Sequence, residues 1–70
     1  MTWIPIDSSV IAAARYRSDL EQLDIRFTNG HVYRYAEVPA AVVRRLIEAE
    51  SAGEYFNLAI RDSYEYEQLE

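Results

Sequence analysis

The chain has 70 residues and a net charge of −5; half of its residues are hydrophobic and it contains no cysteine. A chain of this length forms one domain, predicted here over residues 1–70, and it is too hydrophobic to be disordered. Without cysteine it has no disulfide, no thiolate nucleophile and no cysteine-ligated zinc, so packing must supply its stability.

The N-terminal segment predicts no targeting signal. Residues 1–6 lack a basic region and are interrupted by Pro5. No apolar run elsewhere approaches the ~18 residues that a membrane span needs. We therefore expect a cytoplasmic protein with no membrane contact.

Residues 10–16 predict the first strand, although their alternation of apolar side chains is imperfect. A bulge near Ala12 and Ala13 would place Ile11, Ala14 and Tyr16 on the same face. The small alanines allow another element to approach closely, and Ser18 begins the turn into the next strand.

Two alternating runs, residues 23–28 and 31–35, flank Asn29-Gly30, which is a strong hairpin signal. A two-residue turn would place Ile25 opposite Arg34 and so bring a guanidinium to the apolar face. Burying an unpaired arginine costs several kcal/mol (roughly), which disfavours this register.

A three-residue loop, with Gly30 in the left-handed conformation, pairs Phe27 with His31 instead. Ile25 then faces Tyr33 and Leu23 faces Tyr35, all on one side of the sheet. On the other side Asp24 lies opposite Arg34, which is a favourable cross-strand pair. We predict this second register.

Two short helices are expected downstream. Pro39 suits the first position of a helix, and apolar residues follow it at helical spacing: Val42, Val43, Leu46, Ile47 and Ala49. Ser51 and Glu54 match a capping box for a second helix, while Gly53 could instead end the first helix. The tail at residues 64–67 alternates, as a segment lying along a sheet edge would.

The sequence thus predicts an α+β fold, in which a three-stranded antiparallel β-meander is followed by two short α-helices packed on one face. The middle strand is central. The helices should cover the side chains that share the apolar face: Leu23, Ile25, Phe27, Tyr33 and Tyr35.

Catalytic machinery is not expected. The only histidine, His31, lies at the hairpin tip with nothing to orient it as a base, and one histidine makes no metal site. Two glycines in the whole chain exclude a glycine-rich phosphate loop. We predict a binding module with no cofactor and no metal.

The overall charge disfavours a general polyanion binder, but the charges are unevenly placed. Residues 1–36 are balanced and residues 37–70 carry the whole −5, while all seven cations are arginine. Arg26 and Arg34, joined by Arg15 or Arg17, should lie on the outer sheet face and meet a phosphate backbone. The alternative is an ordinary solvated face neutralised by Asp24.

Asn57 and Arg61 are four residues apart and therefore share one face of the second helix. One interpretation is structural, with Asn57 bonded to a backbone group near Ser8 and Ser9. The other is a rim pocket, open to a small anionic group and formed by Asn57, Arg61 and the hydroxyl of Tyr35.

The chain resembles the KTSC domain family. The resemblance rests on Tyr33-x-Tyr35 at the centre, on Ser51-x-Gly53-x-Tyr55-Phe56-Asn57 and on further matches between about residues 8 and 69. The family is named for its occurrence at the C-terminus of some lysyl-tRNA synthetases and also occurs as small bacterial proteins. It implies no established activity, and RNA binding has been suggested for it.

Two functions are therefore expected. The first is a non-catalytic module that binds RNA, either tRNA or a single strand, through Arg15, Arg26, Arg34, Tyr35, Asn57 and Arg61. The second is a protein–protein interaction module or a homodimer, since Tyr and Arg are enriched at interface hot spots.

Overall fold

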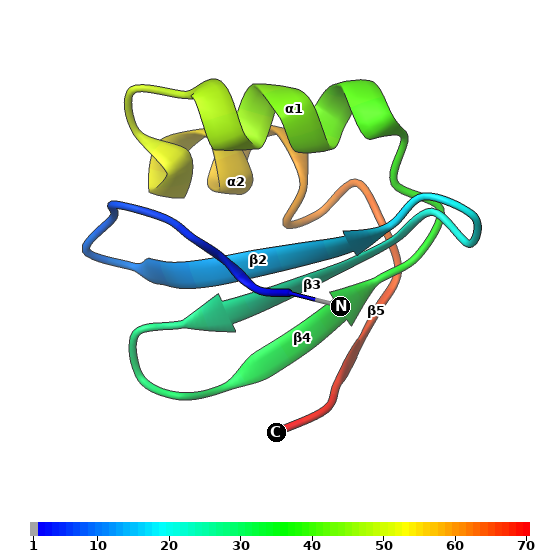
Figure 1. Ribbon diagram of the computed structural model, residues 1–70, viewed down its shortest axis with the longest axis horizontal. Helices are drawn as coiled ribbons and strands as arrows, with labels where there is room; N and C mark the ends of the chain where they lie inside the picture. Colours follow the sequence, from blue (N-terminus) through cyan, green and yellow to red (C-terminus); the bar gives the residue numbers. More distant parts are fainter. Residues whose placement is uncertain (1) are drawn as a thin grey trace.

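The computed structural model describes residues 2–70 and shows an antiparallel sheet of five strands with two helices on one side (Figure 1). Met1, the first residue of the predicted domain, lies outside the described residues. The strands are β1 (Ile4–Pro5), β2 (Ile11–Arg17), β3 (Gln22–Phe27), β4 (Val32–Tyr35) and β5 (Tyr66–Gln68). The helices are α1 (Ala40–Glu48) and α2 (Ala52–Ala59). The strands follow one another in chain order, so β3 is central, as predicted.

The predicted number of strands was wrong: the three predicted strands are present as β2, β3 and β4, but the sheet has two more, β1 and β5. β1 pairs with β2 through Ile4 and Ala14, and β5 pairs with β4 through Tyr66 and Tyr35. The extended tail was expected along a sheet edge, and it forms β5. A two-residue strand that contains Pro5 has no period-two pattern to reveal it, because the sequence signal needs at least four alternating residues.

The hairpin between β3 and β4 has the predicted register. Ile25 pairs with Tyr33 and Asp24 with Arg34. The backbone N–H groups of Phe27 and Gly30 donate to His31 O and Phe27 O respectively, both at 2.9 Å. Gly30 has φ of 93°, the left-handed conformation that a type I turn with a glycine bulge requires.

β2 begins and ends one residue later than predicted, at Ile11 and Arg17, and it contains the predicted bulge. Its register against β3 shifts between Ile11 and Ala13. The bulge lets Ile11 and Ala14 both reach the buried face, where each is at most 1% exposed.

The helix boundaries differ slightly from those predicted. Pro39 is the N-cap of α1 rather than its first residue, with an extended ψ of 151°. Ser51 caps α2 as predicted, its Oγ accepting from the backbone N–H of Glu54 at 3.2 Å. Gly53 lies inside α2, so the alternative in which it ends the first helix was wrong. A Cβ at Gly53 would lie 3.6 Å from Ser8 Oγ, so α2 approaches the chain before β2 closely here.

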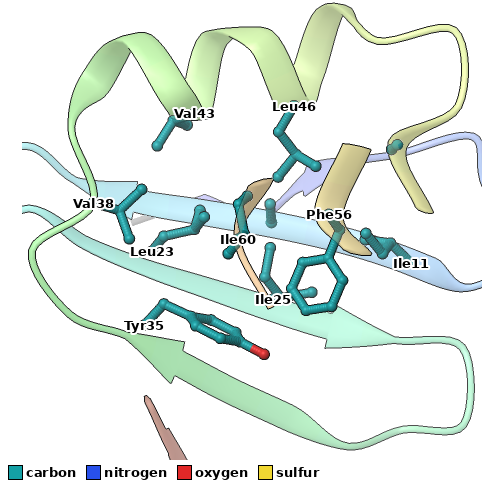
Figure 2. Packing of buried hydrophobic residues seen from close by; sticks show 11 residues of the cluster. Ile11, Leu23, Ile25, Tyr35, Val38, Val43, Leu46, Phe56 and Ile60 are labelled. Atoms are coloured by element: carbon teal, nitrogen blue, oxygen red, sulfur yellow. The ribbon is translucent and has the colours of Figure 1, made fainter. Parts of the chain in front are cut away.

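The core fills the layer between the helices and the sheet (Figure 2). Leu46 of α1 and Phe56 of α2 point toward the sheet, where they meet Leu23, Ile25 and Tyr35. Phe27 and Tyr33 are half-buried and pack against this cluster. The helices therefore cover the predicted face. In the described chain neither helix combines the length and the apolar character needed to cross a membrane.

Candidate functional site

The six residues predicted to bind RNA fall into two groups on opposite sides of the sheet. Arg15, Arg26 and Arg34 extend from β2, β3 and β4 on the outer face, whereas the other three lie on the helix side. The helix-side group is Tyr35, Asn57 and Arg61. The two groups therefore form separate surfaces of the molecule.

On the outer face Asp24 joins two of the arginines. Its carboxylate is 2% exposed and accepts from Arg15 Nε at 2.8 Å and from Arg34 Nε at 2.9 Å. Arg34 also donates through Nη2 at 3.2 Å. Burial alone raises the pKa of Asp24, but the hydrogen bonds and charges of Arg34 and Arg15 outweigh it, so the pKa is lowered overall.

Trp3 adds a second contact to the same face. The guanidinium carbons of Arg15 and Arg26 each lie 4.3 Å from the centre of its ring, which is within the range of a cation–π interaction. Arg17 is instead 3.7 Å from Asp19 in an exposed ion pair. Either Arg15 or Arg17 was expected beside Arg26 and Arg34 on the outer face, and the structure places Arg15 there. Each of the three predicted phosphate contacts thus already has a protein partner.

On the helix side an open pocket of about 430 Å³ lies between β4, β5 and the end of α2. We call it the rim pocket. It contains all three helix-side residues of the predicted site. Its lining residues are Val10, Phe27, Asn29, His31, Tyr33, Tyr35, Phe56, Asn57, Arg61, Asp62 and Tyr66.

Five of the lining side chains are aromatic, and each ring contacts the next in a closed cycle. The cycle runs through Phe27, Tyr33, Tyr66, Tyr35 and Phe56. The distances between successive ring centres are 5.6, 5.4, 5.5 and 5.5 Å, and the centres of Phe56 and Phe27, which close the cycle, are 5.4 Å apart. The three contacts involving a phenylalanine are edge-to-face, whereas Tyr66 is tilted by 36° and 38° to its tyrosine neighbours. Tyr66 is 58% exposed, so much of its ring remains available to a ligand.

Tyr35 contributes a hydroxyl to the rim pocket, although the residue is only 3% exposed. Within the described residues this hydroxyl has no hydrogen-bond partner, and it is not among the fully buried polar atoms. Burial, with smaller contributions from Tyr66, Tyr33 and Asp62, raises the pKa of Tyr35 to about 12, and Arg61 opposes the shift. The hydroxyl therefore stays protonated at neutral pH and can donate a hydrogen bond.

Asn57 is exposed, and within the described residues no hydrogen bond joins its side chain to a backbone group near Ser8, so the structural interpretation gains no support. Ser8 Oγ instead accepts from the backbone N–H groups of Val10 and Ile11, at 3.1 and 3.2 Å. Asn57 lies between the rim pocket and a second hollow lined by Ser8 and Ser9. Its amide is free to meet a ligand in the rim pocket.

Sequence reasoning missed two parts of the rim pocket. Tyr66 comes from β5, and the alternation of Tyr64 and Tyr66 in the tail was the only signal for it. His31 was expected to be isolated at the hairpin tip, yet its Nδ1 lies 3.3 Å from Glu70 O and 3.2 Å from Gln68 Nε2. The hairpin tip and the tail therefore hold each other beside the pocket.

The rim pocket offers aromatic faces, amide groups, a phenol donor and one charge of each sign, from Arg61 and Asp62. Such an arrangement can stack a flat ring and bond its polar edge. Among residues 2–70 there is no group of three His, Cys, Asp or Glu side chains placed to hold a metal ion.

The chain is similar to several known proteins. It is 40% identical over 63 residues to a lysine–tRNA ligase of Trichormus variabilis, a match that covers 90% of this chain but 11% of the ligase. The chain thus spans about a tenth of the length of that relative. An uncharacterised protein of Stutzerimonas stutzeri is 33% identical over 91% of this chain and 90% of its own length.

The fold also matches a solved structure. A KTSC domain protein from Yersinia pestis superimposes with a TM-score of 0.92 at 27% identity, over 99% of this chain and 97% of that one. The KTSC domain model matches residues 7–64, which include both the Tyr33-x-Tyr35 and the Ser51–Asn57 motifs. The chain belongs to the KTSC domain family.

Proposed function

We propose that this chain is a non-catalytic domain that binds single-stranded RNA through the rim pocket. The observation that carries the proposal is that Asn57 and Arg61 line one pocket together with a cycle of five aromatic rings that includes Tyr35. Proteins recognise single-stranded RNA by stacking unpaired bases on aromatic side chains and bonding the base edges. The relatives named lysine–tRNA ligases are consistent with an RNA context.

The outer arginines have a structural role in this proposal. Arg15 and Arg34 hold a buried carboxylate, and Arg15 and Arg26 flank Trp3. A phosphate that bound there would compete with these contacts. Arg61 is then the arginine that meets a phosphate beside the pocket.

The salt dependence of RNA affinity separates the two surfaces. For single strands, log affinity falls against log salt with a slope of about −0.7 per phosphate contact. Binding at the rim pocket through Arg61 predicts a slope of about −0.7, whereas three contacts on the outer face predict about −2. The measurement is fluorescence anisotropy of a labelled single-stranded RNA between 50 and 200 mM salt (approximate limits).

Two substitutions sharpen the test. Arg61→Ala should weaken binding by at least about tenfold, because a hydrogen bond to a charged group contributes about 1.5–3 kcal/mol and 1.4 kcal/mol is a factor of ten. Arg44→Ala removes the same charge from the exposed side of α1, away from the pocket, and should leave affinity almost unchanged. An equal loss of affinity in both variants would mean that only the net charge of the protein matters. No binding at low salt would end the proposal.

A second candidate is a protein-interaction module or a homodimer. It is supported by β5, all of whose residues are exposed and which lies at the edge of the sheet. The tail itself covers the edge of β4, however, so on this side of the sheet a partner strand has only the three residues of β5 to pair with. Light scattering over a range of concentrations tests the dimer: a constant monomer mass would remove it.

A further inference from the structure

The rim pocket has the dimensions and chemistry of a site for one nucleotide, and we infer that it holds a single unpaired purine of the RNA. This inference rests on the proposed function and names the ligand group that occupies the site. A volume of about 430 Å³ lies in the lower half of the range of small-molecule pockets, about 300–1,000 Å³. Such a pocket suits one nucleotide rather than a run of bases.

The floor of the pocket favours a flat ring system. Tyr33 and Tyr66 lie side by side with ring centres 5.4 Å apart and planes tilted by 38°. They come from neighbouring strands, and the exposed ring of Tyr66 is the outermost of the cycle. Because the two planes differ by 38°, a flat base stacks on one ring only. A purine stacked on one ring still contacts the other, so it gains more contact than a pyrimidine does.

The polar groups of the pocket match the edge of a base. The Tyr35 hydroxyl and the Asn57 amide come from β4 and α2, so two elements supply polar groups to the same pocket. Asparagine can bond adenine through an adjacent acceptor and donor, and a phenol adds one more donor. Arg61 was expected on the second helix but lies two residues beyond the end of α2. It lines the same pocket as Asn57, so it can reach the phosphate next to the bound base.

Two other occupants fit less well. A cation would be attracted by the tyrosine faces, but Arg61 offsets Asp62, so these two side chains bring no net negative charge to the pocket. An aromatic side chain of a protein partner would stack equally well, but it would leave the Tyr35 hydroxyl and the Asn57 amide without partners. A purine uses both the aromatic floor and the polar groups.

The test compares three RNA heptamers that share six uridines and differ at the central nucleotide, which is adenosine, uridine or an abasic ribose. The adenosine heptamer should bind at least about fivefold more tightly than the other two, which is the weakest discrimination expected of a paired base edge. Equal affinity for the abasic heptamer would overturn the base site. Equal affinity for the uridine heptamer would overturn the choice of a purine.

Variants link that preference to the pocket. Asn57→Ala should reduce the preference for adenosine to the part that stacking supplies, without unfolding the protein, since Asn57 is exposed. Leu58→Ala is the matched control: Leu58 is 86% exposed and lies outside the pocket, so the preference should persist. An undiminished preference in Asn57→Ala would overturn the assigned contact.

The two proposals fail in different ways. Heptamers that bind with no dependence on the central base would contradict the purine site and leave RNA binding intact. Heptamers that do not bind at low salt would contradict the proposed function itself. A competition experiment with adenosine monophosphate and ribose 5-phosphate completes the test. Only adenosine monophosphate should displace the adenosine heptamer. Displacement by both compounds would assign the site to phosphate or ribose and overturn the base site.

Discussion

Asp24 is the polar group whose replacement should affect stability most. Its carboxylate is buried in the central strand, and the arginines that bond it keep side chains that are 29% exposed. Asp24→Asn preserves the shape but removes the charge, leaving Arg15 and Arg34 without their partner. Breaking a buried pair costs about 3–5 kcal/mol, and partial exposure of the arginines lowers our estimate to about 2–4 kcal/mol.

That loss is large against the stability of the whole domain. At about 0.05–0.15 kcal/mol per residue, a chain of this length is stable by roughly 3.5–10 kcal/mol. Urea unfolding followed by circular dichroism should therefore show a much lower midpoint with an unchanged slope. Asp19→Asn is the control, because its exposed pair with Arg17 should contribute under about 1 kcal/mol.

The pH dependence of stability provides a second test of the cost of Asp24→Asn. The pKa of Asp24 is lowered in the folded protein, so its contribution is present above the unfolded value of about 4 and disappears as the pH falls through the folded value. The difference between wild type and Asp24→Asn should be constant above about pH 5 and shrink below about pH 4. A cost under about 1 kcal/mol at neutral pH, or one independent of pH, would refute the reasoning.

Three further substitutions test the fold, each by urea unfolding. Gly30→Ala should cost about 1–2 kcal/mol although a Cβ would meet no atom within 4 Å, because φ is 93°; a neutral result would contradict the strain argument. Ser51→Ala should cost about 1 kcal/mol by leaving the Glu54 N–H uncapped, while Ser51→Asp should preserve stability. Tyr16→Phe removes the bond from its hydroxyl to Val38 O, at 2.6 Å, and should cost about 1 kcal/mol; no loss would mean that water replaces the bond.

The sequence predicted the central part of the fold because local rules agree there. The Asn29-Gly30 signal and the cost of burying Arg34 together determined the hairpin register, which placed Tyr33 and Tyr35 on the helix side. The cap at Ser51 followed from a four-residue motif. These features depend on neighbours in the chain, where spacing alone carries the information.

The features that sequence reasoning missed depend on contacts between distant segments. Trp3 reaches Arg15 and Arg26 only because β1 folds back along β2, and a two-residue strand leaves no periodic pattern. Tyr66 completes the rim pocket only because β5 pairs with β4. The grouping of Tyr35 with Asn57 and Arg61 was anticipated as one of two alternatives; all three line the rim pocket, and their role in binding stays a prediction.

The most direct test of the central claim is an amide NMR titration of the protein with a short single-stranded RNA at low salt. Binding at the rim pocket predicts that the largest shifts cluster at Tyr33, Asn57, Arg61 and Tyr66 and saturate together, while Arg15 and Arg26 on the outer face change little. Shifts concentrated on the outer face, or no shifts at millimolar RNA, would contradict the account.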